Sequence, residues 1–128
     1  MEFQEELFYS EDHEWVRDEG NTATIGITDF AQSQLKDIVY VDLPENGSEY
    51  KKGESMGVVE SVKTVADIFS PVTGKVVEKN LGLKDHPEWV NTAPYGKGWL
   101  LKMELKERGE LKELLSSKAY QGTLSEEP

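Results

Sequence analysis

The chain has 128 residues, enough to bury one hydrophobic core but not two, so a single domain over residues 1–128 is expected. With 25 acidic and 14 basic residues, its formal net charge of −11 argues against a nucleic acid or an anionic membrane as partner. The absence of cysteine excludes a disulfide framework, a thiol nucleophile and a thiolate zinc site, so any dithiol chemistry must come from an attached group.

The N-terminal residues 1–8 contain three glutamates and no apolar run, so they resemble neither a signal peptide nor an arginine-rich transit peptide. No segment approaches the length of a membrane span. We therefore expect a soluble, cytoplasmic protein, or a protein of the mitochondrial matrix only if a transit peptide has been removed.

The first half of the chain predicts three strands and one short helix. Turn residues over 18–21 are expected to join the first two strands as a hairpin. Thr28 can cap the helix, and Phe30 and Leu35 are available to pack inward. The third strand is so apolar that both of its faces are expected to be covered. These elements are predicted over residues 14–17 (strand), 22–27 (strand), 29–35 (helix) and 38–43 (strand).

The residues around Lys63 predict a hairpin whose turn lacks the usual turn-forming residues. Two β-branched runs flank Lys63 between Gly57 and Pro71, which predicts a hairpin over about 57–71 with the lysine near its tip. A tight turn normally uses Asn-Gly, Asp-Gly or Gly-Gly to supply positive φ, and Val62-Lys63 supplies none of these. Since turn chemistry does not explain these residues, the Lys63 amine is the candidate functional group.

A lysine becomes a nucleophilic catalyst when burial or a neighbouring cation lowers its pKa. The sequence instead places Lys63 in a solvent-facing turn between the carboxylates Glu60 and Asp67. This setting favours a lysine that another enzyme acylates. The alternative is an exposed lysine that only solvates the edge of a strand.

After the hairpin, residues 74–78 repeat the Gly-hydrophobic-Glu pattern of residues 57–60, as two similar half-sheets packed face to face would. A helical turn is expected near 88–91, and the alternation over 99–105 predicts a half-buried strand. The fold expected from these elements is mainly β.

The C-terminal region predicts a helix over about 110–120. Leu111, Leu114 and Leu115 lie at helical spacing. Glu110 at the expected N-terminus of this helix would interact favourably with the helix dipole.

No enzyme constellation is present in the sequence. His13 and His86 are the only histidines, and neither belongs to a His-Glu-x-x-His motif. A glycine-rich phosphate loop and a Gly-x-Ser-x-Gly elbow are also absent. We therefore expect no catalytic residue and no metal site.

Glu-Ser-Val-Lys at 60–63, followed by Ser-Pro-Val-Thr-Gly at 70–74, resembles the lipoyl-attachment hairpin of carrier domains. Biotinyl domains look similar but usually place methionine on both sides of the lysine. Together with further segments, this hairpin resembles the H-protein family of the glycine cleavage system, over about residues 9–120. The further segments are 13–16 (His-Glu-Trp-Val), 25–32, 39–44 and 90–99.

The resemblance implies a hammerhead-like lipoyl/biotinyl-carrier sandwich with small peripheral helices, acting as a non-catalytic carrier with lipoate amidated to Lys63. In the family, glycine decarboxylase (P protein) loads an aminomethyl group on the lipoyl arm while its disulfide is reduced. Aminomethyltransferase (T protein) passes the methylene to tetrahydrofolate and releases ammonia, and dihydrolipoamide dehydrogenase (L protein) reoxidises the arm. The implied partners are these three proteins and a lipoylating enzyme.

The resemblance also implies residues that dock the loaded arm, which correspond here to Glu14 and Asp67. A carboxylate bonded to the arm's primary amine can hold a hydrolysable group away from water. The alternative for Glu14 is a solvated strand residue. Asp12, at a position where some members carry a hydroxyl residue, is a further candidate for docking the arm, and so is Glu60. Glu60 and Asp67 are also expected to guide the lipoylating enzyme.

Two residues depart from the family pattern. Lys36 stands where a glycine is frequent, and Val65 stands where members often have a small residue. Neither removes the modifiable lysine, but both leave open a role as a lipoate relay that delivers lipoyl groups to other enzymes. A purely structural or biotin-carrying hammerhead domain is the alternative from a different class.

Overall fold

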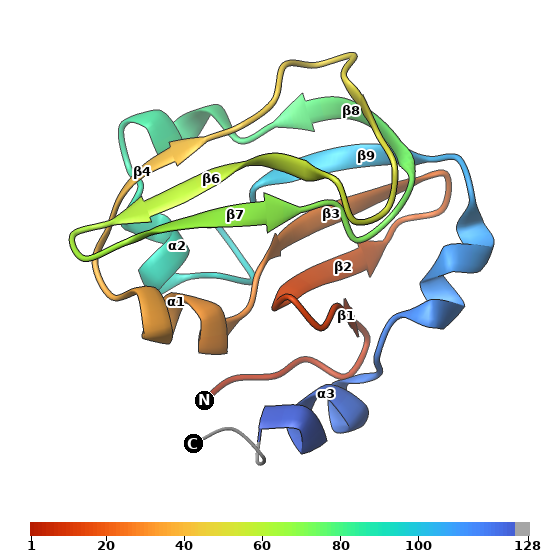
Figure 1. Ribbon diagram of the computed structural model, residues 1–128, viewed down its shortest axis with the longest axis horizontal. Coiled ribbons are helices and arrows are strands. Elements are labelled where there is room, and N and C mark those ends of the chain that lie inside the picture. Colours follow the sequence, from red (N-terminus) through yellow and green to blue (C-terminus); the bar gives the residue numbers. More distant parts are fainter. Residues whose placement is uncertain (125–128) are drawn as a thin grey trace.

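The structure is a computed structural model that describes residues 1–124, and it consists of two antiparallel sheets with short peripheral helices (Figure 1). One sheet has six strands, in the order β1 (Phe8–Tyr9), β2 (Glu14–Asp18), β3 (Thr22–Ile27), β9 (Leu101–Leu105), β8 (Gly74–Lys79) and β5 (Glu49–Tyr50). The other has three, in the order β4 (Ile38–Asp42), β6 (Ser55–Ser61) and β7 (Val65–Phe69). The helical elements are α1 (Asp29–Leu35), α2 (Trp89–Thr92), α3 (Ser117–Leu124) and the 3-10 turns η1 (Leu81–Lys84) and η2 (Arg108–Glu113).

One hydrophobic core joins the two sheets. Val16 and Ile25 of the six-stranded sheet and Val59 and Ile68 of the three-stranded sheet belong to a single cluster of buried side chains. A second, largely aromatic cluster lies around Trp15, between the six-stranded sheet and the chain termini. The predicted mainly β sandwich with small peripheral helices is therefore confirmed. None of the helices within residues 1–124 is long and apolar enough to cross a membrane.

The helix predicted over residues 29–35 is confirmed, and so is its cap. The Thr28 hydroxyl accepts a hydrogen bond from the Ala31 backbone N–H at 3.1 Å. Ala31 and Leu35 pack against the main core, and Phe30 stacks at a tilt on the His13 ring. The capping residue and the apolar side chains near it were enough to define this helix from the sequence.

The range predicted for the C-terminal helix, 110–120, is wrong. The 3-10 turn η2 precedes an extended segment at Leu114, and α3 begins only at Ser117. Leu115 pairs with Tyr9 of β1 through two backbone hydrogen bonds of 2.7 and 2.8 Å. This pairing outweighs the helical spacing of the leucines, because it satisfies the backbone of both segments while leaving Leu111 buried.

The expectation that both faces of residues 38–43 are covered is also wrong. The side chains of Val39 and Tyr40 are 47% and 53% exposed. Strand β4 lies at an edge of an antiparallel sheet whose inner face packs on the core, so its outer face meets solvent.

Lys36, which ends α1, has a left-handed backbone with φ 68° and ψ −146°. Its carbonyl accepts from the Asn91 side chain at 2.7 Å, and that side chain also accepts from the Ile38 N–H at 3.0 Å. These bonds tie the helix end to β4 in a conformation that favours glycine, since a Cβ is crowded there. Lys36 therefore stores backbone strain.

We expect Lys36→Gly to raise the free energy of unfolding by roughly 1 kcal/mol, because the strain relieved exceeds the entropy that glycine adds to the unfolded chain. Urea unfolding at neutral pH measures the change. Lys36→Ala is the matched control, since it removes the charge and keeps the Cβ. Equal stabilities for the two variants would show that Lys36 is not strained.

Candidate functional site

Lys63 lies at the tip of the hairpin formed by β6 and β7, which projects beyond the helices at the left of Figure 1. The Ser61 hydroxyl closes the turn by accepting from the backbone N–H groups of Lys63 and Thr64, at 3.2 and 3.1 Å. The Val62 N–H donates to the Asp37 carbonyl at 3.0 Å. No residue of the turn adopts positive φ. A serine side chain thus replaces turn glycines, a role that the sequence did not reveal.

The Lys63 amine is presented to solvent. The residue is exposed, and within residues 1–124 no hydrogen bond or ion pair engages its side-chain nitrogen. Glu60 lies on β6 opposite Val65, and Asp67 lies on β7, where the Ser55 hydroxyl donates to it at 3.2 Å. The lysine is therefore accessible to an enzyme that acylates it, with two carboxylates nearby on the strands.

Glu14 is buried at the start of β2, with only 2% of its surface exposed, so the alternative of a solvated strand residue is wrong. The Ser10 hydroxyl donates to one carboxyl oxygen at 2.5 Å, and the Phe69 backbone N–H donates to the other at 3.2 Å. Because Phe69 ends β7, this side chain links the six-stranded sheet to the edge of the three-stranded sheet.

Burial raises the pKa of Glu14 to about 8. The hydrogen bonds from Ser10 and from the Phe69 backbone lower the pKa but do not offset the loss of hydration, and the nearby Asp12 carboxylate raises it slightly. No lysine or arginine of the described chain contacts the Glu14 carboxyl. A buried carboxyl without a cationic partner can accept a cation from a bound group, and its proton is then released.

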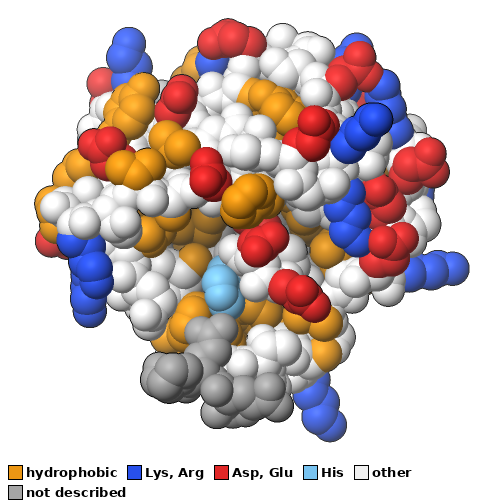
Figure 2. Space-filling model, in the orientation of Figure 1, with side chains coloured by type: hydrophobic (Ala, Val, Ile, Leu, Met, Phe, Trp, Pro, Cys, Tyr) orange, Lys and Arg blue, Asp and Glu red, His pale blue; other side chains and the backbone are white. Residues whose placement is uncertain are grey.

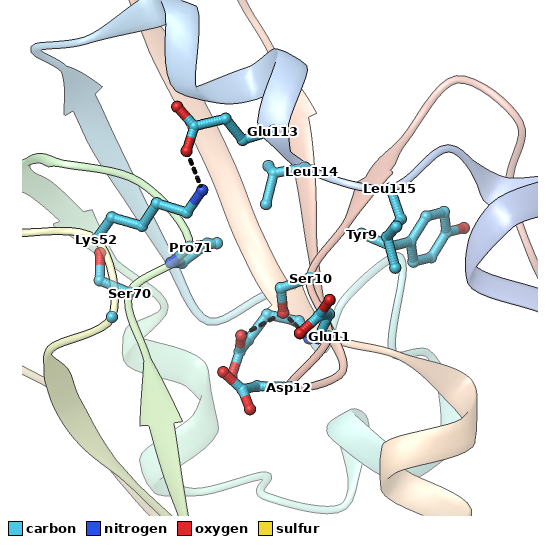
Figure 3. A pocket seen from close by; sticks show the side chains of 12 residues that line it. Tyr9, Ser10, Glu11, Asp12, Lys52, Ser70, Pro71, Glu113, Leu114 and Leu115 are labelled. Carbon is cyan, nitrogen blue, oxygen red and sulfur yellow. Dashed lines mark hydrogen bonds and ion pairs between the residues drawn. The ribbon is translucent and has the colours of Figure 1, made fainter. Parts of the chain in front are cut away.

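A pocket of about 260 Å³ opens beside Glu14 (Figure 3). Ser10 and Asp12 lie on one side of it, and the ion pair between Lys52 and Glu113, with a nitrogen–oxygen distance of 2.7 Å, lies across from them. Asp12 and Glu14 thus line one pocket, whereas Asp67, which the resemblance pairs with Glu14, does not. The Lys52–Glu113 pair joins residues 61 positions apart and had no signal in the sequence.

Lys63, Glu60 and Asp67 lie outside the lining of this pocket, on the hairpin. Strand geometry places the Lys63 backbone about 20 Å from Phe69, which bonds to Glu14. Asp67 lies between them along β7. The structure therefore separates an exposed lysine from a buried carboxyl by the length of one strand.

Within the described part of the chain, no three histidine, cysteine, aspartate or glutamate side chains are grouped so that they could hold a metal ion.

Comparison with known proteins gives a consistent result. The family model described as "Glycine cleavage H-protein" matches residues 7–127. The chain is 53% identical over 121 residues to the glycine cleavage system H protein of Staphylococcus haemolyticus, covering 94% of this chain and 96% of that protein. It is 49% identical over 127 residues to that of Thermus thermophilus, covering 99% of both. A crystal structure of a glycine cleavage system H protein from Mycobacterium marinum, 36% identical, superposes with a TM-score of 0.88 and covers 96% and 99% of the two chains.

The raised pKa of Glu14 makes stability depend on pH. The folded protein keeps the proton up to about pH 8 and the unfolded chain releases it near 4.5, so the free energy of unfolding falls as pH rises between these values. By pH 7 the fall amounts to about 3 kcal/mol. Glu14→Gln keeps the shape without the titration, so its stability should not show this fall in urea unfolding from pH 4.5 to 8.

Glu11→Gln is the control, because Glu11 lines the same pocket but is exposed. Parallel stability profiles for wild type and Glu14→Gln would mean that Glu14 does not hold a proton in the folded state.

Proposed function

The chain belongs to the glycine cleavage H-protein family, and from this premise we propose that it is a non-catalytic lipoyl carrier with lipoate attached to Lys63. The observation that supports this most directly is the exposed Lys63 amine, which no other described residue engages, at the tip of a hairpin. Among residues 1–124 this charge takes part in no ion pair, so acylation would break none of the ion pairs there.

We propose that the carrier serves the P, T and L proteins of the glycine cleavage system. Attached to Lys63, the lipoyl group would supply the disulfide and thiol chemistry on which these three proteins act. The contribution of this chain is to tether the group, which turns diffusional encounters into local ones, and to protect it from water.

Glu14 is the residue proposed to receive the loaded arm. Its carboxyl is buried, is oriented by Ser10 and by the Phe69 backbone, and has no cationic partner. A primary ammonium arriving there would replace the proton of Glu14 and form a charge-assisted hydrogen bond away from bulk water. Asp67, between Lys63 and Phe69 on β7, and Asp12 in the pocket are proposed to assist.

The first test of this function is the mass of the intact protein after co-expression with a lipoylating enzyme and lipoate. We expect one lipoyl increment on the wild type and none on Lys63→Arg, which keeps the charge but offers no acylatable amine. Lys75→Arg, at an exposed lysine on β8, is the control and should still carry the increment. An increment that persists in Lys63→Arg would place the modification on another residue.

The second test concerns protection. Lipoylated protein is loaded with glycine and P protein, P protein is removed, and the hydrolytic release of formaldehyde and ammonia is followed. We expect Glu14→Gln and Asp67→Asn to accelerate release by about tenfold each, the value of one hydrogen bond to a charged group. Glu11→Gln is the control.

Release at the wild-type rate from both variants would show that these carboxylates do not belong to the docking site.

A lipoylated wild type that glycine and P protein do not reduce, but that donates its lipoyl group to other proteins, would instead support the lipoate relay.

A further inference from the structure

Ser10 closes the loop that leads into β2. Its backbone N–H donates to the Glu14 carbonyl at 2.9 Å, and its own carbonyl accepts from the His13 N–H at 3.2 Å. Its hydroxyl oxygen accepts from the Glu14 backbone N–H at 3.0 Å and lies 2.5 Å from Oε1 of the Glu14 carboxyl. Ser10, which is only 8% exposed, therefore contacts both the backbone and the side chain of Glu14.

The hydrogen bond between the Ser10 hydroxyl and the Glu14 carboxyl can run in either direction. A hydroxyl has one hydrogen to donate and two lone pairs that accept. The Glu14 N–H uses one lone pair, so one hydrogen and one lone pair of Ser10 remain for the carboxyl. An ionised carboxyl accepts the Ser10 hydrogen, whereas a protonated carboxyl can donate its own hydrogen to that lone pair. In the second case the Ser10 hydrogen can turn toward the pocket, which Ser10 lines.

The second carboxyl oxygen of Glu14 has a partner of fixed direction. The Phe69 backbone N–H, at 3.2 Å, can only donate, whatever the protonation of the carboxyl. Of the two groups that are hydrogen-bonded to this carboxyl within residues 1–124, Ser10 is therefore the one that can follow a change of protonation. Because a buried polar group without a hydrogen-bond partner is costly, a partner that reverses stabilises both forms of Glu14.

Charged neighbours do not take over the role of Ser10. Lys52 is paired with Glu113, and the Asp12 carboxylate opposes ionisation of Glu14. Asp67, on β7, is also acidic. In the face of the molecule drawn in Figure 2, acidic side chains lie near the middle and most lysine and arginine side chains toward the rim. The charged and titratable side chains that line the pocket with Glu14 are those of Tyr9, Glu11, Asp12, Lys52 and Glu113. Until a cation docks, hydrogen bonds are what stabilises the charged form of Glu14.

We propose that Ser10 is a positioning residue for the loaded arm, an inference that rests on the docking role proposed for Glu14. The Ser10 hydroxyl accepts a hydrogen bond from the protonated carboxyl while no arm is docked, and it donates one to the carboxylate when the ammonium of the arm docks. On docking, the O–H bond of the carboxyl breaks, its proton leaves through the pocket to solvent, and the Ser10 hydrogen turns to the carboxylate. Ser10 and the Phe69 N–H then each occupy one oxygen, and lone pairs remain for the ammonium.

The first measurement is the titration of the Glu14 carboxyl by carbon-13 NMR, in unmodified protein labelled on glutamate, with Glu14→Gln to assign the signal. In Ser10→Ala the ionised carboxyl loses a charge-assisted hydrogen bond and the protonated carboxyl only a neutral one. The carboxyl should therefore bind its proton about tenfold more tightly than in the wild type. Ser10→Thr keeps the hydroxyl and should titrate like the wild type, and Ser10→Cys, whose thiol is a weak donor, should lie between Ser10→Thr and Ser10→Ala.

Ser70→Ala is the matched control for this titration. Ser70 lines the same pocket and is buried, but its hydroxyl donates to the Val72 carbonyl at 2.6 Å instead of to Glu14. Its removal should leave the titration of Glu14 unchanged. A Glu14 carboxyl that titrates in Ser10→Ala as in the wild type, or at lower pH, would overturn the proposal.

The second measurement uses lipoylated protein that has been loaded with glycine and P protein and then separated from P protein. Hydrolytic release of the aminomethyl group should be about tenfold faster in Ser10→Ala than in the wild type, and close to the wild-type rate in Ser10→Thr. In the Glu14→Gln background, Ser10→Ala should change release by no more than about twofold, because Ser10 acts through the charge of Glu14.

Equal acceleration by Ser10→Ala in both backgrounds would overturn the proposal, since Ser10 would then act through the loop and not through the Glu14 carboxyl. Release from Ser10→Ala at the wild-type rate would overturn it as well. A wild-type release rate in Glu14→Gln, in which Ser10 is intact, would instead contradict the docking role of Glu14 and thus the proposed function itself.

Discussion

Face-to-face packing of the two sheets is the constraint on which the other features depend. The inner sides of both sheets contribute to one buried cluster, which includes Val59 and Ile68 from one sheet and Val16 and Ile25 from the other. Once these faces are closed together, the three-stranded sheet has a single free face, and its β6–β7 hairpin extends past the core with Lys63 at its end. The same closure buries the first residue of β2, Glu14, against the edge of β7.

Burial of Glu14 removes hydration from its carboxyl, while hydrogen bonds from the protein stabilise the charged form. The carboxyl lies where an ionised group loses most of its hydration, and the two hydrogen bonds it accepts do not compensate for that loss, so its pKa rises. The neutral carboxyl still links the two sheets, because it remains hydrogen-bonded to the Ser10 hydroxyl and the Phe69 backbone N–H. A cation brought to the same place would favour the charged form of the carboxyl, which is the physical basis of the docking role proposed for Glu14.

The two ends of β7 therefore have different physical properties. The end at Lys63 is exposed, lies next to a turn closed by Ser61, and is flanked by the exposed side chains of Val62 and Val65. The end at Phe69 is enclosed and adjoins the pocket of Asp12 and Glu14. One strand thus connects the exposed Lys63 with the pocket beside Glu14.

The sequence by itself determined the features that depend on neighbouring residues: the capped helix at Thr28, the strand alternation, and a hairpin with an unexplained lysine at its tip. Only the tertiary structure decided the features that join distant segments. Pairing of Leu115 with Tyr9 broke the helix that the leucine spacing predicted, and an open sheet face exposed Tyr40. Likewise, the left-handed backbone at Lys36 is held by Asn91, 55 residues away, and the protonation of Glu14 depends on its enclosure by β7. Helix and strand patterns are local, whereas backbone pairing and burial depend on which segments the folded chain brings together.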